Sequence, residues 1–103
     1  MGSVRDLPIH LDREAIGAFC RRHHIRKLSL FGSVLTEHFG DESDVDVLVE
    51  FEAEHIPGLF GIVGMEQELS QIVGRKVDLR TAEDLSRYFR DEVVARAEAV
   101  YAP

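Results

Sequence analysis

The sequence has little cysteine, no excess of positive charge and no long apolar run. Cys20 is the only cysteine among 103 residues, so an internal disulfide cannot form. The formal net charge is −7. Proteins that mainly hold phosphate backbones are usually basic, which argues against nucleic acid as the main partner. No stretch approaches the roughly 18 consecutive apolar residues of a membrane span, and the first residues lack a signal-peptide core. We therefore expect a cytoplasmic protein.

What the sequence does contain fits one small globular domain. About 45% of the residues are hydrophobic and 30% are charged, which is ordinary for a folded domain. The length allows one modest core, so residues 1–103 are expected to form a single domain with an irregular start over residues 1–10. Cys20 falls in an apolar-periodic stretch and is expected in that core.

Hydrophobic periodicity predicts helices that alternate with strands. Asp12 is expected to cap the first helix, and Gly74 to end the third. Helices are expected over residues 12–24, 34–39, 59–73 and 81–100, and strands over residues 26–31, 44–52 and 75–80. This order predicts an α/β (α+β) fold with a small mixed β-sheet flanked by helices.

The strand predicted over residues 44–52 has two chemically different faces. Side chains alternate along a strand, so Val45, Val47 and Val49 are expected to face the core. Asp44 and Asp46 then share the opposite face, two residues apart. A polar outer face alone would account for this pair, so its meaning depends on what lies beside it.

A third aspartate, Asp78, lies on the next predicted strand. If the two strands are neighbours, Asp44, Asp46 and Asp78 converge. Three adjacent carboxylates cannot all stay ionised without a counterion. Hard oxygen ligands suit Mg²⁺ or Mn²⁺, and two such ions would clamp the attacking and leaving oxygens of a phosphoryl transfer.

Gly32 and Ser33 stand between a predicted strand and a predicted helix. Backbone N–H groups at a helix start favour anions. Gly32 would let a phosphate approach the backbone closely, and Ser33 would add a hydroxyl donor. A phosphate cradle opposite a set of metal ligands is the arrangement needed for nucleotidyl transfer.

These residues resemble the signature of the polymerase-β-type nucleotidyltransferase superfamily. The signature is Gly32-Ser33, ten residues, Asp44-Val45-Asp46 and a later Asp78. The stretch from Leu28 to Tyr101 is similar to the minimal nucleotidyltransferase branch. The resemblance implies a polymerase-β-like palm in which the three aspartates ligate two Mg²⁺ or Mn²⁺ ions: Asp44 and Asp46 ligate both ions, and Asp78 ligates one of them. It also implies that Asp78 helps to activate the attacking hydroxyl, and that Gly32 and Ser33 hold the β- and γ-phosphates of ATP.

The same resemblance implies an activity and a partner. The family transfers a nucleoside monophosphate from its triphosphate to a hydroxyl and releases pyrophosphate. Members of the minimal branch are commonly antitoxins paired with a HEPN-domain ribonuclease toxin, and several adenylylate a tyrosine of that toxin. We therefore expect an ATP-dependent transferase that modifies a partner protein, and a homo-oligomer is left open.

One position departs from the pattern of the branch. Close relatives often carry an arginine in the short helix after Gly-Ser, whereas residues 34–38 here contain no fixed cation. Arg75, Lys76 and Arg80 are the candidates to replace it. Two other functions stay open: a binding module that neutralises a partner by contact alone, and a small-molecule transferase of the antibiotic-modifying kind.

The histidines form one further candidate group. His23 and His24, together with His10 and His38, could make a transition-metal site. Adjacent histidines point in different directions on a helix, however, and surface or helix-end positions explain these residues equally well.

Overall fold

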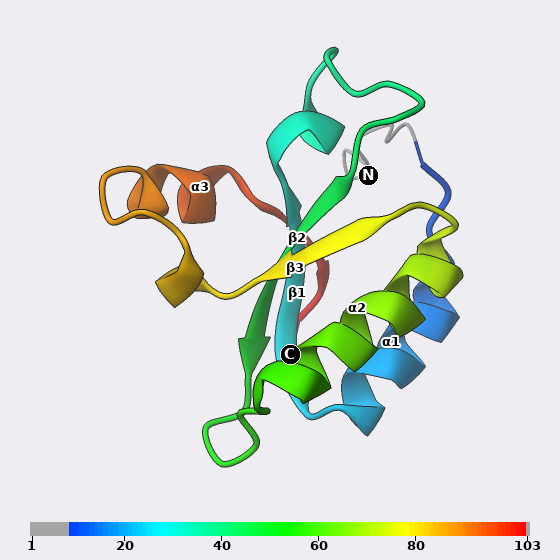
Figure 1. Ribbon diagram of the computed structural model, residues 1–103, viewed down its shortest axis with the longest axis vertical. Coiled ribbons are helices and arrows are strands. Elements are labelled where there is room, and N and C mark those ends of the chain that lie inside the picture. Colours follow the sequence, from blue (N-terminus) through cyan, green and yellow to red (C-terminus); the bar gives the residue numbers. More distant parts are fainter. Residues whose placement is uncertain (1–8, 103) are drawn as a thin grey trace.

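The computed structural model of the chain describes residues 9–102 (Figure 1). The predicted irregular start, residues 1–10, lies almost wholly outside the described residues. The elements in chain order are α1 Arg13–Arg22, β1 Ile25–Phe31, the 3₁₀ turn η1 Gly32–Leu35, β2 Val45–Phe51, α2 Leu59–Val73, β3 Val77–Arg80, the 3₁₀ turn η2 Ala82–Asp84, α3 Arg90–Arg96 and β4 Glu98–Tyr101.

The strands form one mixed sheet in the order β3-β2-β1-β4. Strand β1 is antiparallel to both β2 and β4, whereas β2 and β3 are parallel. The parallel pair is joined by α2, which is the crossover helix that such a pair requires. The predicted class, a small mixed sheet with helices, is therefore confirmed.

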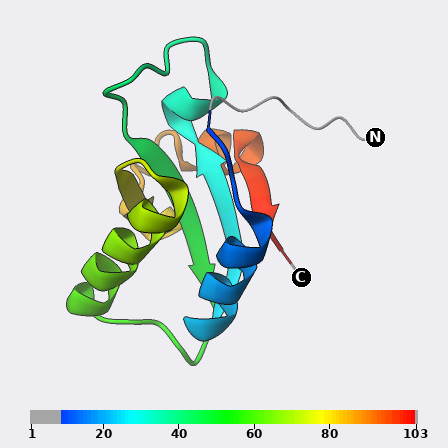
Figure 2. The same cartoon turned by 90° about the vertical axis from the view of Figure 1, so that its right-hand side faces the viewer.

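Helices α1 and α2 lie on one side of the sheet, and η2 and α3 lie on the other (Figures 1 and 2). The core fills the space between the sheet and α1 and α2. It contains Phe19 and Cys20 of α1 and the inward side chains of the strands. Burial raises the pKa of the Cys20 thiol to about 12, so this side chain is a neutral core residue, as expected.

The predicted start of α1 and the predicted end of α2 are confirmed. Asp12 Oδ1 accepts a hydrogen bond from the Ala15 amide at 3.1 Å, so Asp12 is the N-cap of α1. Gly74 adopts the left-handed conformation with φ of 79° and ends α2. None of the helices in the described part of the chain is long and apolar enough to cross a membrane.

The helix predicted over residues 34–39 is wrong. Only the 3₁₀ turn η1 forms, and Thr36 is already extended. The Thr36 hydroxyl donates to the Ser33 carbonyl at 2.9 Å and accepts from the His38 amide at 3.1 Å. These local bonds compete with the helical ones, which explains why the helix stops after a single turn.

The long helix predicted over residues 81–100 is also wrong. The Thr81–Asp84 capping box forms, but it opens only the three-residue turn η2. The Arg90 guanidinium then donates to the carbonyls of Ala82 at 2.7 Å and Leu85 at 3.0 Å, which a continuous helix would have bonded to backbone amides. After the short α3 the chain enters the sheet as β4, where Val100 is buried. Strand β4 covers the edge of β1 that would otherwise be unpaired.

Candidate functional site

The parallel pairing of β2 and β3 places two of the predicted aspartates side by side. The register aligns Val45 with Val77 and Asp46 with Asp78. Because both valines are buried in the core, the two aspartates lie on the opposite face of the sheet. Neighbouring strands are about 4.8 Å apart, so the two carboxylates share one small region.

Asp44 immediately precedes β2, one strand period before Asp46. The Val45 amide donates to the Lys76 carbonyl at 2.8 Å, which fixes this entry to β2 against β3. The Asp44 side chain is 45% exposed, compared with 32% for Asp78. Within the described residues, the carboxylate oxygens of all three aspartates do not come within 4.8 Å of one another. The three therefore face the same region without forming a closed cage.

The edge strand β3 is held in place by side chains of α2. The Glu66 carboxylate accepts from the Leu79 amide at 2.8 Å, and the Ser70 hydroxyl accepts from the Val77 amide at 2.9 Å. These bonds satisfy the amides on both sides of Asp78 that face away from β2. The position of Asp78 is thus set by α2 as well as by the sheet.

The electrostatics of Asp46 reflect this crowding. Its carboxyl pKa is raised above the ordinary value of 3.8, first by burial and then by repulsion from Asp78 and Asp44. Arg80 opposes the rise. A bound cation would offset the repulsion between these carboxylates and so favour their ionised form.

Gly32 connects the Gly-Ser turn directly to Asp46. Its φ is 76°, a conformation that side-chain-bearing residues rarely adopt. A Cβ at this position would lie 2.3 Å from Asp46 Oδ2 and 3.2 Å from Asp46 Cγ. Glycine is therefore required both for the turn and for the close approach of the Asp46 carboxylate. The sequence predicted room for a phosphate at Gly32, and the structure shows that the nearest group is this carboxylate.

Ser33 lies within η1 and is partly buried. Its carbonyl accepts from both the amide and the hydroxyl of Thr36, each at 2.9 Å. The turn that carries Gly32 and Ser33 is thus closed on itself and sits next to the Asp46–Asp78 pair.

A hollow of about 720 Å³ opens beside Gly32. This volume is within the range of small-molecule sites. Its walls come from β1 and η1 on one side and from α3 on the other, and they consist of Phe31, Gly32, Leu35, Thr36, Glu92, Val93, Ala95 and Arg96. Arg96 is paired with Glu92 at 3.0 Å and brings a cation to the hollow. The sequence pattern gave no signal for Arg96, because it placed this segment inside one long helix.

Known proteins share this arrangement of elements. A model of the nucleotidyltransferase domain matches residues 12–100. The chain belongs to the nucleotidyltransferase domain family. The predicted superfamily is thereby confirmed.

Three relatives of this nucleotidyltransferase illustrate the family. The protein adenylyltransferase MntA of Thermococcus cleftensis is 38% identical over 58 residues, which are 56% of this chain and 57% of that protein. The alignment thus covers less than two thirds of the Thermococcus protein. A solved structure provisionally named as a minimal nucleotidyltransferase is 30% identical, with a TM-score of 0.68 over 82% of this chain and 85% of that chain.

The third relative is a chain from the complex of tri-AMPylated Shewanella oneidensis HEPN toxin with MNT antitoxin. It is 19% identical and has a TM-score of 0.63 over 88% of this chain and 70% of that chain. At this identity the likeness is one of fold.

Three cationic side chains could replace the arginine that residues 34–38 lack, and they lie in different places. Arg75 donates to the carbonyls of Gly40, Asp41 and Ser43 at 2.6, 3.0 and 2.9 Å and therefore holds the loop before β2. Lys76 lies 3.9 Å from Asp44 Oδ2. Arg80 donates two hydrogen bonds of 3.1 Å to the Asp78 carboxylate. Arg80 is thus the cation bound most directly to the aspartates.

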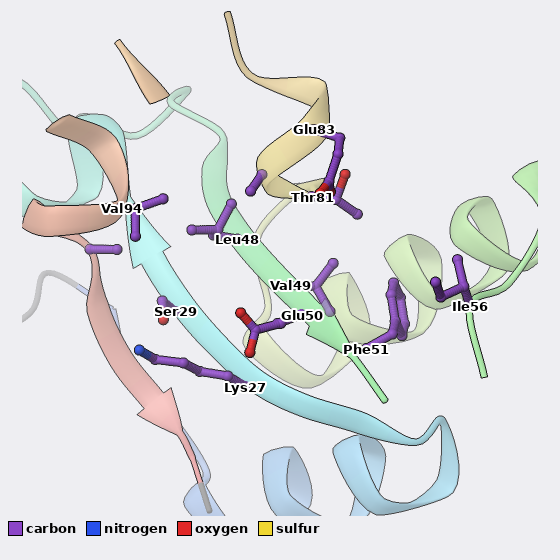
Figure 3. Close-up of a pocket in the computed structure, with 12 residues that line it drawn as sticks. Lys27, Ser29, Leu48, Val49, Glu50, Phe51, Ile56, Thr81, Glu83 and Val94 are labelled. Carbon is purple, nitrogen blue, oxygen red and sulfur yellow. The ribbon is translucent and has the colours of Figure 1, made fainter. Parts of the chain in front are cut away.

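A second hollow, of about 320 Å³, lies on the same outer face of the sheet (Figure 3). Leu48 and Glu50 of β2 line it, and these residues share a face with Asp46. Leu48 and Val94 lie at one end of the hollow, and Lys27, Ser29 and Glu50 gather at the other (Figure 3). The hollow therefore begins one strand period from Asp46, between the sheet and the η2–α3 segment.

Proposed function

We propose that this nucleotidyltransferase is a metal-dependent protein adenylyltransferase. It transfers AMP from ATP to the hydroxyl of a tyrosine on a partner protein. The partner is a ribonuclease toxin of the HEPN class, and this chain acts as its antitoxin. The observation that carries the proposal is the register of Asp46 with Asp78, with Gly32 against the Asp46 carboxylate. The name of the Thermococcus relative and the AMPylated toxin of the Shewanella complex support the choice of reaction and partner.

Asp44, Asp46 and Asp78 are the residues that would hold Mg²⁺ or Mn²⁺, as one or two ions. They fit such ions because they supply hard oxygen ligands and because burial, followed by repulsion from Asp78 and Asp44, raises the pKa of Asp46. When bound, divalent ions neutralise charge on the transferred phosphoryl group and on the leaving pyrophosphate.

The remaining residues bind the nucleotide and guide the acceptor. The backbone of Gly32 and Ser33 would hold the β- and γ-phosphates, with the nucleotide extending into the hollow beside α3. Arg80 and Arg96 would offset the triphosphate charge, which requires Arg80 to leave Asp78 and Arg96 to leave Glu92.

The transfer forms one bond at the α-phosphorus, breaks another there and moves one proton. The acceptor oxygen attacks the α-phosphorus, the bond from that phosphorus to the bridging oxygen breaks, and pyrophosphate leaves. The acceptor proton passes to the Asp78 carboxylate, which is the aspartate nearest to Asp46 on the neighbouring strand. The acceptor segment would approach along the outer face of the sheet, where the hollow of Figure 3 adjoins Asp46.

Label transfer tests the proposal. The purified protein is incubated with Mg²⁺, α-labelled ATP and a HEPN-class partner, beside the double variant Asp44→Asn/Asp46→Asn and the control Glu42→Gln, which changes an exposed carboxylate of the preceding loop. We expect a labelled partner band with the wild type and the control, and at least a thousandfold less label with the double variant. Equal labelling by the double variant would contradict the proposal. Absence of label with a partner that still binds both forms would favour a non-catalytic binding module.

A further inference from the structure

A second group of metal-ligating side chains lies at the other end of the β1–β2 hairpin. His24 precedes β1, and Glu52 follows β2, so the antiparallel pairing of Ile25 with Phe51 brings them together. Asp46 pairs with Phe31 at the opposite end of the hairpin. Glu52 lies six residue steps beyond Asp46 along the extended chain, which corresponds to roughly 20 Å. This second group is therefore remote from the nucleotidyltransferase site.

The group consists of His24, Glu52 and His55. One ligand atom from each of the three lies within 4.8 Å of the other two, and this is the only such trio of His, Cys, Asp or Glu in the described part of the chain. The imidazole rings of His24 and His55 stack with centroids 3.8 Å apart and an interplanar angle of 14°. His55 Nδ1 lies 3.9 Å from Glu52 Oε1. All three side chains are exposed, so an ion from solvent can reach them.

The backbone holds the three residues in register with one another. The Glu52 amide donates to the His24 carbonyl at 3.0 Å, and the His55 amide donates to the Glu52 carbonyl at 2.9 Å. His24 has a φ of 56° and is the only non-glycine residue with positive φ among the described residues. Residues held in this sparsely populated region concentrate at functional sites. The turn thus presents the His24 ring toward the loop that carries Glu52 and His55.

The neighbouring histidine does not take part. His23 Nε2 lies 2.8 Å from Glu68 Oε1, and its ring packs against Phe19 with centroids 4.8 Å apart. The set suggested by the sequence, His10, His23, His24 and His38, therefore does not assemble in the described residues. His24 instead meets two residues of a distant loop, which no local spacing could reveal.

We propose that His24, Glu52 and His55 bind a transition-metal ion, with Zn²⁺ as the best match. Two imidazole nitrogens and one carboxylate oxygen are ligands that Zn²⁺ favours, whereas Mg²⁺ and Ca²⁺ favour oxygen ligands only. Three protein ligands leave a fourth position for water or for a group of a partner molecule.

The ion would fasten the loop before α2 to the start of β1. This loop carries Ile56, whose side chain is 72% exposed, at the edge of a hollow that His24 and His55 also line. Because the site exists only in the folded chain, Zn²⁺ should stabilise the fold. This effect is independent of nucleotide and does not rely on transferase activity.

Zn²⁺ titration followed by calorimetry and by thermal unfolding tests the site. The measurements are made on metal-stripped protein in excess Mg²⁺, which competes for the aspartates. The variants are His55→Ala, Glu52→Gln and His24→Asn, since asparagine tolerates positive φ. His38→Ala is the matched control, because His38 is an exposed histidine outside the trio.

We expect one Zn²⁺ per wild-type or His38→Ala chain and a rise in their unfolding temperature. Each trio variant should bind at least about tenfold more weakly and lose that rise. Co²⁺ should give the absorption of a four-coordinate site in the wild type and in His38→Ala, but not in the trio variants. Wild-type affinity for Zn²⁺ equal to that of His55→Ala, or no binding by the wild type, would overturn the proposal.

Discussion

The inner and outer faces of the sheet have different surroundings, although the side chains of both faces alternate along the same strand. Val45 and Val47 are 0% and 1% exposed and pack under α1 and α2. Asp46, between them, points to the other side, where it meets two more carboxylates and the backbone of Gly32. The apolar face supplies the free energy of folding that lets the polar face keep unfavourable charges close together. Substitutions on the inner face should therefore have consequences different from those of substitutions on the outer face.

The largest expected effect comes from Gly32→Ala compared with Gly74→Ala. Both glycines have φ near 76–79°, so both substitutions should cost about 1–2 kcal/mol of folding free energy through backbone strain. Only at Gly32 does the new Cβ collide with Asp46, because no atom lies within 4 Å of the Cβ position at Gly74. We expect Gly32→Ala to lower the rate of AMP transfer by about 100-fold or more, and Gly74→Ala to leave the rate per folded molecule unchanged.

Urea denaturation and transfer assays on the same two preparations separate these effects. Equal loss of transfer in both variants would show that strain, and not the contact with Asp46, governs the site.

The second effect concerns stability on the two faces of β2. Val47→Ala removes buried methyl groups and should lower the free energy of unfolding by about 2 kcal/mol, whereas Leu48→Ala on the partly exposed outer face should cost less than about 1 kcal/mol. Denaturation midpoints with unchanged slopes would measure the difference. An equal loss of unfolding free energy in the two variants would contradict the distinction between the two faces.

The smallest effect is a gain of stability from Asp46→Asn in the absence of divalent ions. The pKa of Asp46 is raised in the folded state, so the wild type loses stability as the pH rises from the unfolded value of 3.8 through the raised folded value. The variant escapes this loss and should be more stable at pH 7 by up to about 1 kcal/mol, since the group is partly screened by solvent. The gain should vanish below pH 3.8 and shrink when Mg²⁺ is added.

Thermal unfolding in EDTA at pH 7 and at low pH measures this gain. A variant that is less stable than the wild type at pH 7 would mean that Asp46 holds the fold together and not only the site.

The sequence predicted what depends on short-range periodicity. The uninterrupted alternation from Val45 to Phe51 determined both faces of β2, and the bounds of α2 agree with the pattern and with Gly74 as its end. It could not predict what depends on pairing between distant segments. The sequence pattern predicts helix where strand β4 forms, because the partner of β4, the open edge of β1, is a tertiary feature.

Residues of the sites divide in the same way. The side-by-side placement of Asp46 and Asp78 was conditional on the strands being neighbours, and the structure meets that condition. The contact between Gly32 and Asp46 depends on the β1–β2 register, as does the meeting of His24 with Glu52. No local spacing in the sequence encodes that register.

The most direct test of the central claim is to map where a paramagnetic ion and a nucleotide bind on the chain. Uniformly ¹⁵N-labelled, Zn²⁺-free protein is titrated with substoichiometric Mn²⁺ in the presence of AMP-PNP, and the broadening of amide signals is followed by NMR. The account predicts broadening at Gly32, Ser33, Asp46 and Asp78, with signals of Glu52 and His55 left sharp. Broadening confined to the His24–Glu52–His55 end, or spread evenly over both ends of the hairpin, would contradict the assignment of the outer face at Gly32 as the nucleotidyl-transfer site.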